Sequence, residues 1–204
     1  MKAVIFDYGA GNLHSLAKAL QHDGVSVHIE PDPRRAVEGD VLVLPGVGAF
    51  GAAVSRLAVG RDVMREAILG GLPTIGICLG MQLLFDASDE GPGGGLGVLA
   101  GRVTRLSANR VPQIGWNDLR AVESEPLFVR APLPIAYYAN SFVCRPDDER
   151  TVIAWTSHED DRFPAAVRAG RTIGVQFHPE KSSSAGVRFL HAFLRESAAT
   201  GATR

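Results

Sequence analysis

The chain has 204 residues, of which 46% are hydrophobic and 21% charged, so it is long enough for one domain with a full core. Its formal net charge of −1 provides no broad electrostatic field for nucleic acid or a membrane surface. With only two cysteines, Cys78 and Cys144, the chain could form at most one disulfide bond. Because the sequence shows neither a signal-peptide pattern nor an apolar run of about 20 residues, we expect a cytoplasmic protein.

In the first half of the chain, short apolar runs alternate with amphipathic patterns. Strands are predicted at residues 3–6, 25–29, 40–44 and 73–77, and helices at residues 11–24, 61–70 and 79–86. Continuous Val, Ile and Leu strands separated by helices are typical of a parallel sheet that is covered on both faces.

The second half of the chain contains mainly strand-like runs with short breaks. Strands are predicted at residues 102–106, 134–144, 151–156, 165–168 and 172–177, and a last helix at residues 184–197. We therefore expect an α/β fold whose central, mostly parallel sheet is flanked by helices and carries added antiparallel strands in the second half. Since no linker or repeat interrupts the pattern, residues 1–198 are predicted to form one domain, followed by a disordered tail at 199–204.

The strand at 73–77 runs directly into the segment Gly76-Ile-Cys78-Leu-Gly80. This has the form of a nucleophile elbow, with cysteine in place of serine. The flanking glycines allow a tight turn and close packing, and the start of the following helix favours the reactive thiolate. A packed structural cysteine is the alternative, but the junction of strand and helix favours catalysis by Cys78.

A cysteine nucleophile needs a base, and the base needs an orienting group. Of the six histidines, His178 ends the strand at 172–177 and begins the segment His178-Pro-Glu180. Parallel strands of an α/β sheet end at one edge, so Cys78 and His178 meet if their strands are neighbours. Glu180 can then hold the imidazole tautomer. The other histidines fit packed or solvated positions better, including His158, for which metal ligation is the weaker interpretation.

The segment PGVGAFG, residues 45–51, contains the G-x-G-x-x-G pattern of dinucleotide-binding proteins. That pattern normally follows the first strand of a βαβ unit, with an acidic residue about 20 positions later at the end of the next strand. Here it follows the third strand, Pro45 intervenes, and Glu66 falls within a predicted helix. A dinucleotide-binding module is therefore the weaker alternative.

The elbow GICLGMQ and the segment His178-Pro-Glu180 resemble the class I glutamine amidotransferases, which are Cys-His-Glu glutaminases. The segments FDYGAGNLHSLAKAL, LPGVGAF, GICLGMQLLF, VPQIGWN and FHPEKS together resemble one family among them, the glutaminase subunits of imidazole glycerol phosphate synthases. These segments extend from residue 6 to 182. The elbow and His-Pro-Glu specify only the wider group, so a glutaminase of another amination system, such as pyridoxal phosphate synthesis, stays open as an alternative.

The resemblance implies that the chain hydrolyses glutamine to glutamate and ammonia. Cys78 would form a glutamyl thioester, His178 would transfer protons and Glu180 would orient His178. A (β/α)₈-barrel cyclase would receive the ammonia through a channel, forming a heterodimer with this chain. In histidine biosynthesis that partner makes imidazole glycerol phosphate and an aminoimidazole carboxamide ribotide. The resemblance implies no cofactor and no metal.

The resemblance also assigns residues around the nucleophile. The resemblance gives the Val47 backbone N–H as one donor of the oxyanion hole, and the elbow pattern itself gives the N–H of Leu79, next after the nucleophile, as the other. Because glycine permits reorientation of a peptide, we expect the Gly46–Val47 peptide to flip when the partner binds. The residues expected to contact glutamine are Gly48, Gln82, Asn140, Ser141 and Phe142. The residues expected to face the cyclase are Asn12, Trp116, Asn117 and Lys181. This chain has Asn140-Ser-Phe142 where the family commonly has His-Ser-Tyr, so contacts from that strand are expected to come mostly from its backbone.

Overall fold

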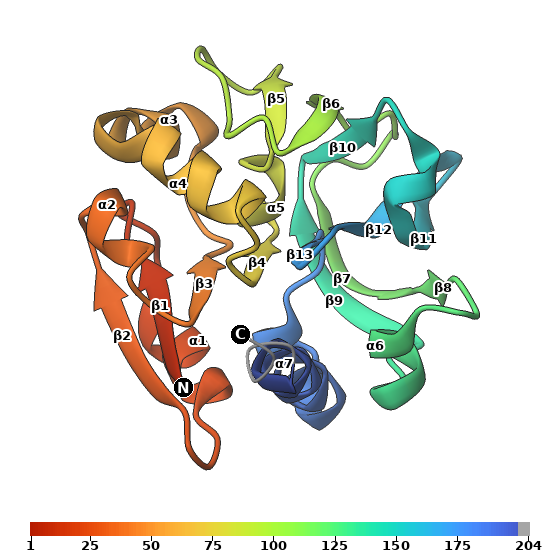
Figure 1. Cartoon of the computed structure of the whole chain (residues 1–204). Coiled ribbons are helices and arrows are strands. Elements are labelled where there is room, and N and C mark those ends of the chain that lie inside the picture. Colours follow the sequence, from red (N-terminus) through yellow and green to blue (C-terminus); the bar gives the residue numbers. More distant parts are fainter. Residues whose placement is uncertain (200–204) are drawn as a thin grey trace.

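The structure is a computed structural model that describes residues 1–199 of the chain. A central eight-stranded sheet runs through the molecule, with helices on both faces (Figure 1). Five neighbouring strands are parallel, in the spatial order β2 (Ser26–Glu30), β1 (Lys2–Phe6), β3 (Val41–Leu44), β4 (Thr74–Ile77) and β13 (Thr172–Val175). Three antiparallel strands continue the sheet as β12 (Asp161–Ala169), β11 (Val152–His158) and β8 (Arg120–Ala121). The predicted α/β architecture is confirmed.

Alternation along the buried parallel strands explains why both faces carry helices. In β1, Ala3 and Ile5 belong to one apolar core, whereas Val4 and Phe6 belong to a second core on the other face. The first core is covered by α1 (Leu13–Leu20), α6 (Pro126–Arg130) and α7 (Ser183–Ala199). The second is covered by α2 (Pro33–Ala36), α3 (Phe50–Leu57), α4 (Arg61–Leu69) and α5 (Leu79–Gln82). Short 3₁₀ turns are η1 (Ala58–Gly60), η2 (Glu149–Thr151) and η3 (Pro179–Lys181).

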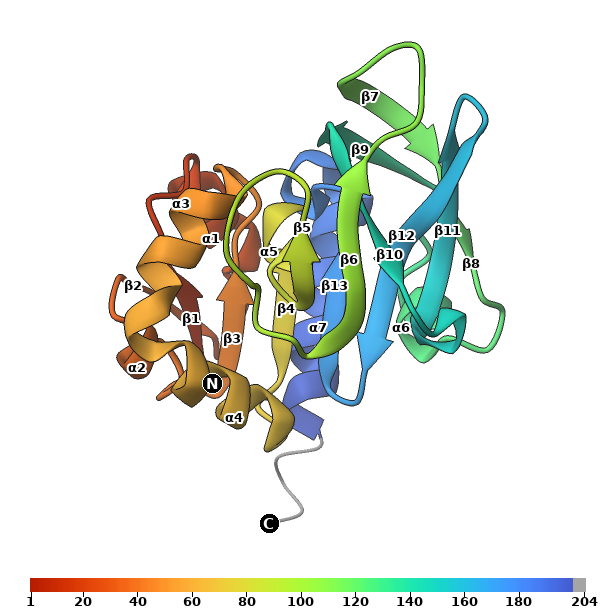
Figure 2. The same ribbon diagram turned by 90° about the horizontal axis from the view of Figure 1, so that it is seen from above.

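Two smaller sheets lie beside the central one. The first contains β5 (Phe85–Ser88), β6 (Leu99–Arg105) and β10 (Phe142–Pro146), and the second contains β7 (Gln113–Asp118) and β9 (Ile135–Asn140). Figure 2 shows β7 and β9 toward the end of the molecule at which β1 and β3 also finish. The small sheets therefore build walls around that end of the central sheet.

The structure differs from the sequence-based expectations at several elements. The helix predicted at 79–86 is a single turn, because residues 85–88 instead pair with β6 as strand β5. The run at 134–144 is two strands that separate at Ser141 and join different sheets. Helix α3 and strand β7 were not predicted. Glycines weaken the helical signal of α3, and β7 is preceded by Pro112 and interrupted by Gly115.

No helix within residues 1–199 is long and apolar enough to cross a membrane. Helix α7 continues to Ala199, one residue beyond the expected end of the domain. Residues 200–204, which make up the rest of the predicted tail, lie outside the described part of the chain.

Two glycines let the turn after β4 pack against its own strand and against β3. A Cβ added at Gly76 would lie 2.5 Å from the carbonyl oxygen of Gly80, and a Cβ added at Gly80 would be closer still to the backbone of Leu44. Contacts this short with rigid backbone atoms force the backbone to shift, which destabilises the turn. The glycines on each side of Cys78 are therefore steric requirements of the turn.

We expect Gly76→Ala to lower the free energy of unfolding by about 1 to 3 kcal/mol, because the added methyl group overpacks the turn. Gly51→Ala is the matched control. It lies in α3, where the added Cβ would have its nearest neighbour at 3.7 Å, and alanine favours a helix by up to about 1 kcal/mol. Urea unfolding of both variants measures the difference, and equal stability of Gly76→Ala and the natural chain would contradict the steric argument.

Candidate active site

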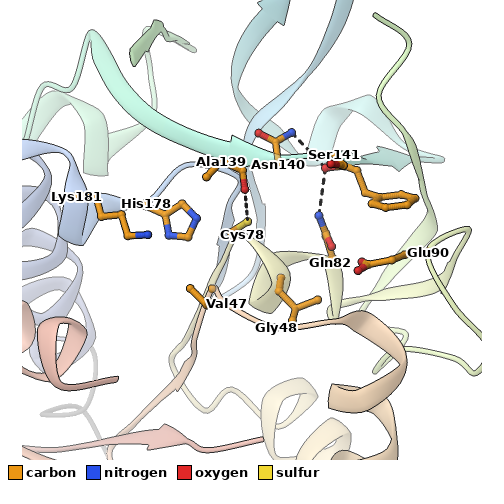
Figure 3. A pocket seen from close by; sticks show the side chains of 13 residues that line it. Val47, Gly48, Cys78, Gln82, Glu90, Ala139, Asn140, Ser141, His178 and Lys181 are labelled. Atoms are coloured by element: carbon orange, nitrogen blue, oxygen red, sulfur yellow. Dashed lines mark hydrogen bonds between the residues drawn. The ribbon is translucent and has the colours of Figure 1, made fainter. Parts of the chain in front are cut away.

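The candidate nucleophile and the candidate base follow adjacent strands. β4 and β13 are parallel neighbours in which Ile77 is paired with Val175, so both strands end at the same edge of the sheet. The Cys78 N–H donates to the Val175 carbonyl oxygen at 2.7 Å, just before the chain turns into α5. His178 faces Cys78 in the same cavity (Figure 3). The expected meeting of these two residues is confirmed.

Cys78 occupies a strained backbone conformation, with φ of 47° and ψ of −104°. Positive φ is costly for a residue with a side chain, and such strain persists where the surrounding structure enforces it, often at functional sites. The side chain is 6% exposed and lines the cavity. These features are those of a nucleophile elbow.

His178 and Glu180 form a buried pair held by the turn η3. The His178 ring is 2% exposed, and its Nδ1 lies 2.9 Å from Glu180 Oε1. This contact leaves Nε2 for the sulfur of Cys78. Burial alone would lower the pKa of His178, but hydrogen bonds with Cys78 and Glu180 outweigh it and raise the pKa to about 9. The ring is therefore protonated at neutral pH, and its charge favours a thiolate on Cys78.

A cavity of about 330 Å³ opens in front of Cys78 and is large enough for an amino acid. It is lined by all of the residues expected to contact glutamine, namely Gly48, Gln82, Asn140, Ser141 and Phe142. The Phe142 carbonyl oxygen accepts hydrogen bonds from Gln82 Nε2 at 3.2 Å and from Asn140 Nδ2 at 3.3 Å. The break between β9 and β10 at Ser141 thus turns backbone groups toward the cavity.

Two residues of the cavity wall, Glu90 and Ala139, were missed by sequence reasoning. The Glu90 and Gln82 side chains lie next to each other on one side of Cys78 (Figure 3). Burial raises the pKa of Glu90, and a hydrogen bond from the Phe50 N–H opposes this shift. The residue lies in a glycine-rich loop without periodicity, so the sequence carries no signal for its position.

The glycine-rich segment after β3 lines the same cavity through Gly46, Val47 and Gly48. A Cβ added at Gly46 would lie 2.9 Å from His178 Cε1, and Gly48 has a φ of 149°. The Tyr8 hydroxyl donates to the Pro45 carbonyl oxygen and fixes the start of the segment. Both glycines are explained by their neighbours in this cavity, which leaves the dinucleotide alternative without support.

The residues expected to face a partner have different surroundings. Asn12 is exposed, Trp116 is 52% exposed and contacts the Tyr137 ring edge-on, and Lys181 lines the cavity. In contrast, the Asn117 amide donates to Thr156 Oγ1 at 3.1 Å and to the Ser157 carbonyl oxygen at 2.6 Å. Asn117 therefore holds β7 against β11, and its contact with a partner stays a prediction.

Cys78 and Cys144 are both free and buried, so the lone disulfide left open by the sequence is not formed. Within residues 1–199, no group of three or more His, Cys, Asp or Glu side chains is arranged to hold a metal ion.

Comparison with known proteins agrees with this geometry. A family model described as glutamine amidotransferase class-I matches residues 4–196. The chain is 45% identical to the imidazole glycerol phosphate synthase subunit HisH of Symbiobacterium thermophilum, over 93% of this chain and 91% of the relative. It is 40% identical to the subunit of the same name from Halobacterium salinarum, over 94% of this chain and 91% of the relative.

Solved structures show the same fold at lower identity. A crystal structure described as a glutamine amidotransferase has a TM-score of 0.74 at 21% identity, covering 96% of this chain and 98% of that chain. A chain of PurLQS from Thermotoga maritima has a TM-score of 0.72 at 20% identity, with the same coverage. The family match and the curated relatives together establish that this chain is a glutamine amidotransferase of class I and belongs to the family of the HisH subunit of imidazole glycerol phosphate synthase.

Proposed function

We propose that Cys78, His178 and Glu180 hydrolyse the side-chain amide of glutamine. The observation that carries this proposal is a buried, hydrogen-bonded His178–Glu180 pair that shares one cavity with a cysteine in a strained elbow. The imidazole can act as an acid, and amide attack requires the cysteine in its thiolate form.

The reaction proceeds in two halves with balanced proton transfers. The Cys78 thiolate attacks the amide carbon, and the negative charge moves to the amide oxygen. The backbone N–H groups of Val47 and Leu79 stabilise this oxyanion. The His178 imidazolium then gives its proton to the leaving nitrogen, so ammonia departs and a glutamyl thioester remains. In the second half His178 takes a proton from water, which attacks the thioester and expels the Cys78 thiolate with glutamate.

The amino-acid end of glutamine binds at the side of the cavity that contains Gln82 and Glu90. Figure 3 shows these two side chains on one side of Cys78, with Lys181 on the other. Carboxylates form strong, charge-assisted hydrogen bonds with ammonium groups, so Glu90 binds the α-ammonium group of glutamine. Gln82 and the backbone of the 140–142 segment supply neutral hydrogen-bonding groups.

The ammonia passes to a (β/α)₈-barrel cyclase that binds over the mouth of this cavity. An apolar face supports this part of the proposal. Ile114 and Ile135 are 68% and 44% exposed and lie on the same face of the β7–β9 ribbon as Trp116. Ala139, opposite Ile114 in the register, lines the cavity. Exposed apolar groups in a continuous patch mark interaction surfaces.

The cyclase controls hydrolysis through the glycine-rich segment. The Val47 side chain is 37% exposed, and Gly11, next to the predicted contact Asn12, lies against Val47: a Cβ added at Gly11 would be 3.4 Å from Val47 Cγ1. A partner that presses on this region flips the Gly46–Val47 peptide and turns the Val47 N–H toward the oxyanion. The chain then works in the cytoplasm as the ammonia source for histidine biosynthesis.

Cys78→Ala and Cys78→Ser are expected to lower glutamine hydrolysis by at least about 10³-fold, since the nucleophile is lost. The assay measures glutamate release with and without a purified barrel cyclase and its nucleotide ligand, and the natural chain is expected to respond to the partner. The matched control is Cys144→Ala, because Cys144 is also a buried cysteine but lies outside the cavity. This variant is expected to keep its activity. Full hydrolysis by Cys78→Ala would contradict the proposal.

The pH dependence of stability tests the His178 pair. Its pKa is raised from 6.5 to about 9, so its contribution to folding is complete below about pH 6.5 and is lost as the pH rises through about 9. The natural chain should therefore lose roughly 1 to 3 kcal/mol more than His178→Gln between pH 6.5 and 9.5. Urea unfolding at both pH values measures this, and parallel curves for the two proteins would show that the pair is not charged.

Glu90→Gln is expected to raise KM for glutamine by about 10- to 100-fold with a smaller effect on kcat, because a charged hydrogen bond to the substrate is lost. The amide oxygen of the substituted side chain at position 90 can still accept a hydrogen bond from the Phe50 N–H, so the loop should keep its place. Glu66→Gln, an exposed change on α4, serves as the control. If KM stays unchanged in Glu90→Gln, the α-ammonium group binds elsewhere.

A further inference from the structure

Gln176 is a polar side chain buried directly beside the nucleophile, and the mechanism above does not use it. Its exposed fraction is 0%, and it is not among the residues that line the cavity. Its side-chain Nε2 donates to Cys78 Sγ at 3.5 Å. Its Oε1 has no hydrogen-bond partner within residues 1–199. The amide thus contacts the sulfur from within the protein.

The fold explains why the side chain points there but not why it is polar. Val175 and Phe177 belong to the core under α7, so Gln176 points to the opposite face, toward α5. Gly174 lies on the same face, where an added Cβ would be 2.6 Å from Met81 Cγ. An unpartnered amide oxygen in such a place costs about 1 to 3 kcal/mol. An apolar side chain would avoid this cost, so the N–H contact with sulfur is the feature that accounts for a glutamine.

The Cys78 sulfur has contacts that favour opposite protonation states. The Ala139 carbonyl oxygen, 4.0 Å away, can only accept and so favours the thiol. The Gln176 N–H can only donate and so favours the thiolate. Other titratable groups also surround the sulfur. His178, hydrogen-bonded to Glu180, supplies positive charge. Burial raises the pKa values of Tyr8 and Cys144, so both stay neutral. Lys181 and Glu90 line the cavity.

We propose that Gln176 is a further catalytic residue, whose amide N–H holds the Cys78 sulfur in its charged, attacking form and stabilises it again when water expels it. This inference rests on the proposed function. The C–S bond forms as charge leaves the sulfur for the amide oxygen, and it breaks as charge returns to the sulfur. The donor therefore contributes at the start of the first half and at the end of the second, where the sulfur is negative.

The test measures alkylation of Cys78 by iodoacetamide as a function of pH, in a Cys144→Ala background so that one thiol reacts. In Gln176→Met the pH at which alkylation reaches half of its maximal rate should rise by about one pH unit, which corresponds to the loss of one hydrogen bond to a charged group. This pH is the alkylation midpoint. Gln176→Glu keeps the shape of the side chain but places an oxygen beside the sulfur, so its midpoint should rise further. The matched control is Gln113→Met, because Gln113 is also buried with an unpartnered Oε1, and its midpoint should not move.

Stability distinguishes this role from simple packing. Gln176→Met removes the unpartnered oxygen, so its free energy of unfolding should equal or exceed that of the natural chain. An unchanged alkylation midpoint in folded Gln176→Met, or in Gln176→Glu if the first variant does not fold, would overturn the inference. Alkylation needs neither glutamine nor a partner. A natural chain that fails to hydrolyse glutamine would therefore refute the proposed function without affecting this result.

Discussion

The parallel pairing of β4 with β13 is the constraint on which the candidate site depends. It joins two strands that are far apart in the sequence, and it places the first residues after each strand at one edge of the sheet. Ile75 and Ile173 are fully buried, so a slip of one residue would turn apolar side chains to the wrong face. The same register that buries the core therefore sets the distance between Cys78 and His178.

Neighbouring groups, acting against burial, determine the charge of His178. A buried imidazole on its own would be neutral, because desolvation penalises its charged form. His178 is instead protonated, since Glu180 and Cys78 both stabilise the cation. A charged pair enclosed in protein interacts more strongly than the same pair in water. The site therefore holds an imidazole that can act as an acid beside Cys78, and the neutral amide of Gln176 reaches the sulfur from outside the cavity.

The sequence predicted those parts of the site that depend on local pattern or on a general rule of topology. The elbow around Cys78 is a local pattern, and its meeting with His178 follows from the rule that parallel strands end at one edge. The helix predicted at residues 79–86 extended into the start of β5, because a short buried run such as Leu83-Leu84-Phe85 fits either structure and the pairing with β6 decides the outcome. Glu90 was missed for a related reason, since the position of a loop without periodicity depends on the surfaces it packs against.

The glycine-rich segment shows why a pattern of residues needs its neighbours before it can be interpreted. Gly46 is required by the His178 ring, and Gly48 by its positive φ and by Leu79, whose Cδ2 would lie 3.2 Å from an added Cβ. Gly51 has neither restriction, since it lies inside α3 with space for a side chain. In a dinucleotide fingerprint all three glycines serve one ligand. Here Gly46 and Gly48 line the cavity of the nucleophile, whereas Gly51 belongs to the following helix and shares no role with them. The G-x-G-x-x-G spacing in this chain is therefore not the mark of a single binding site.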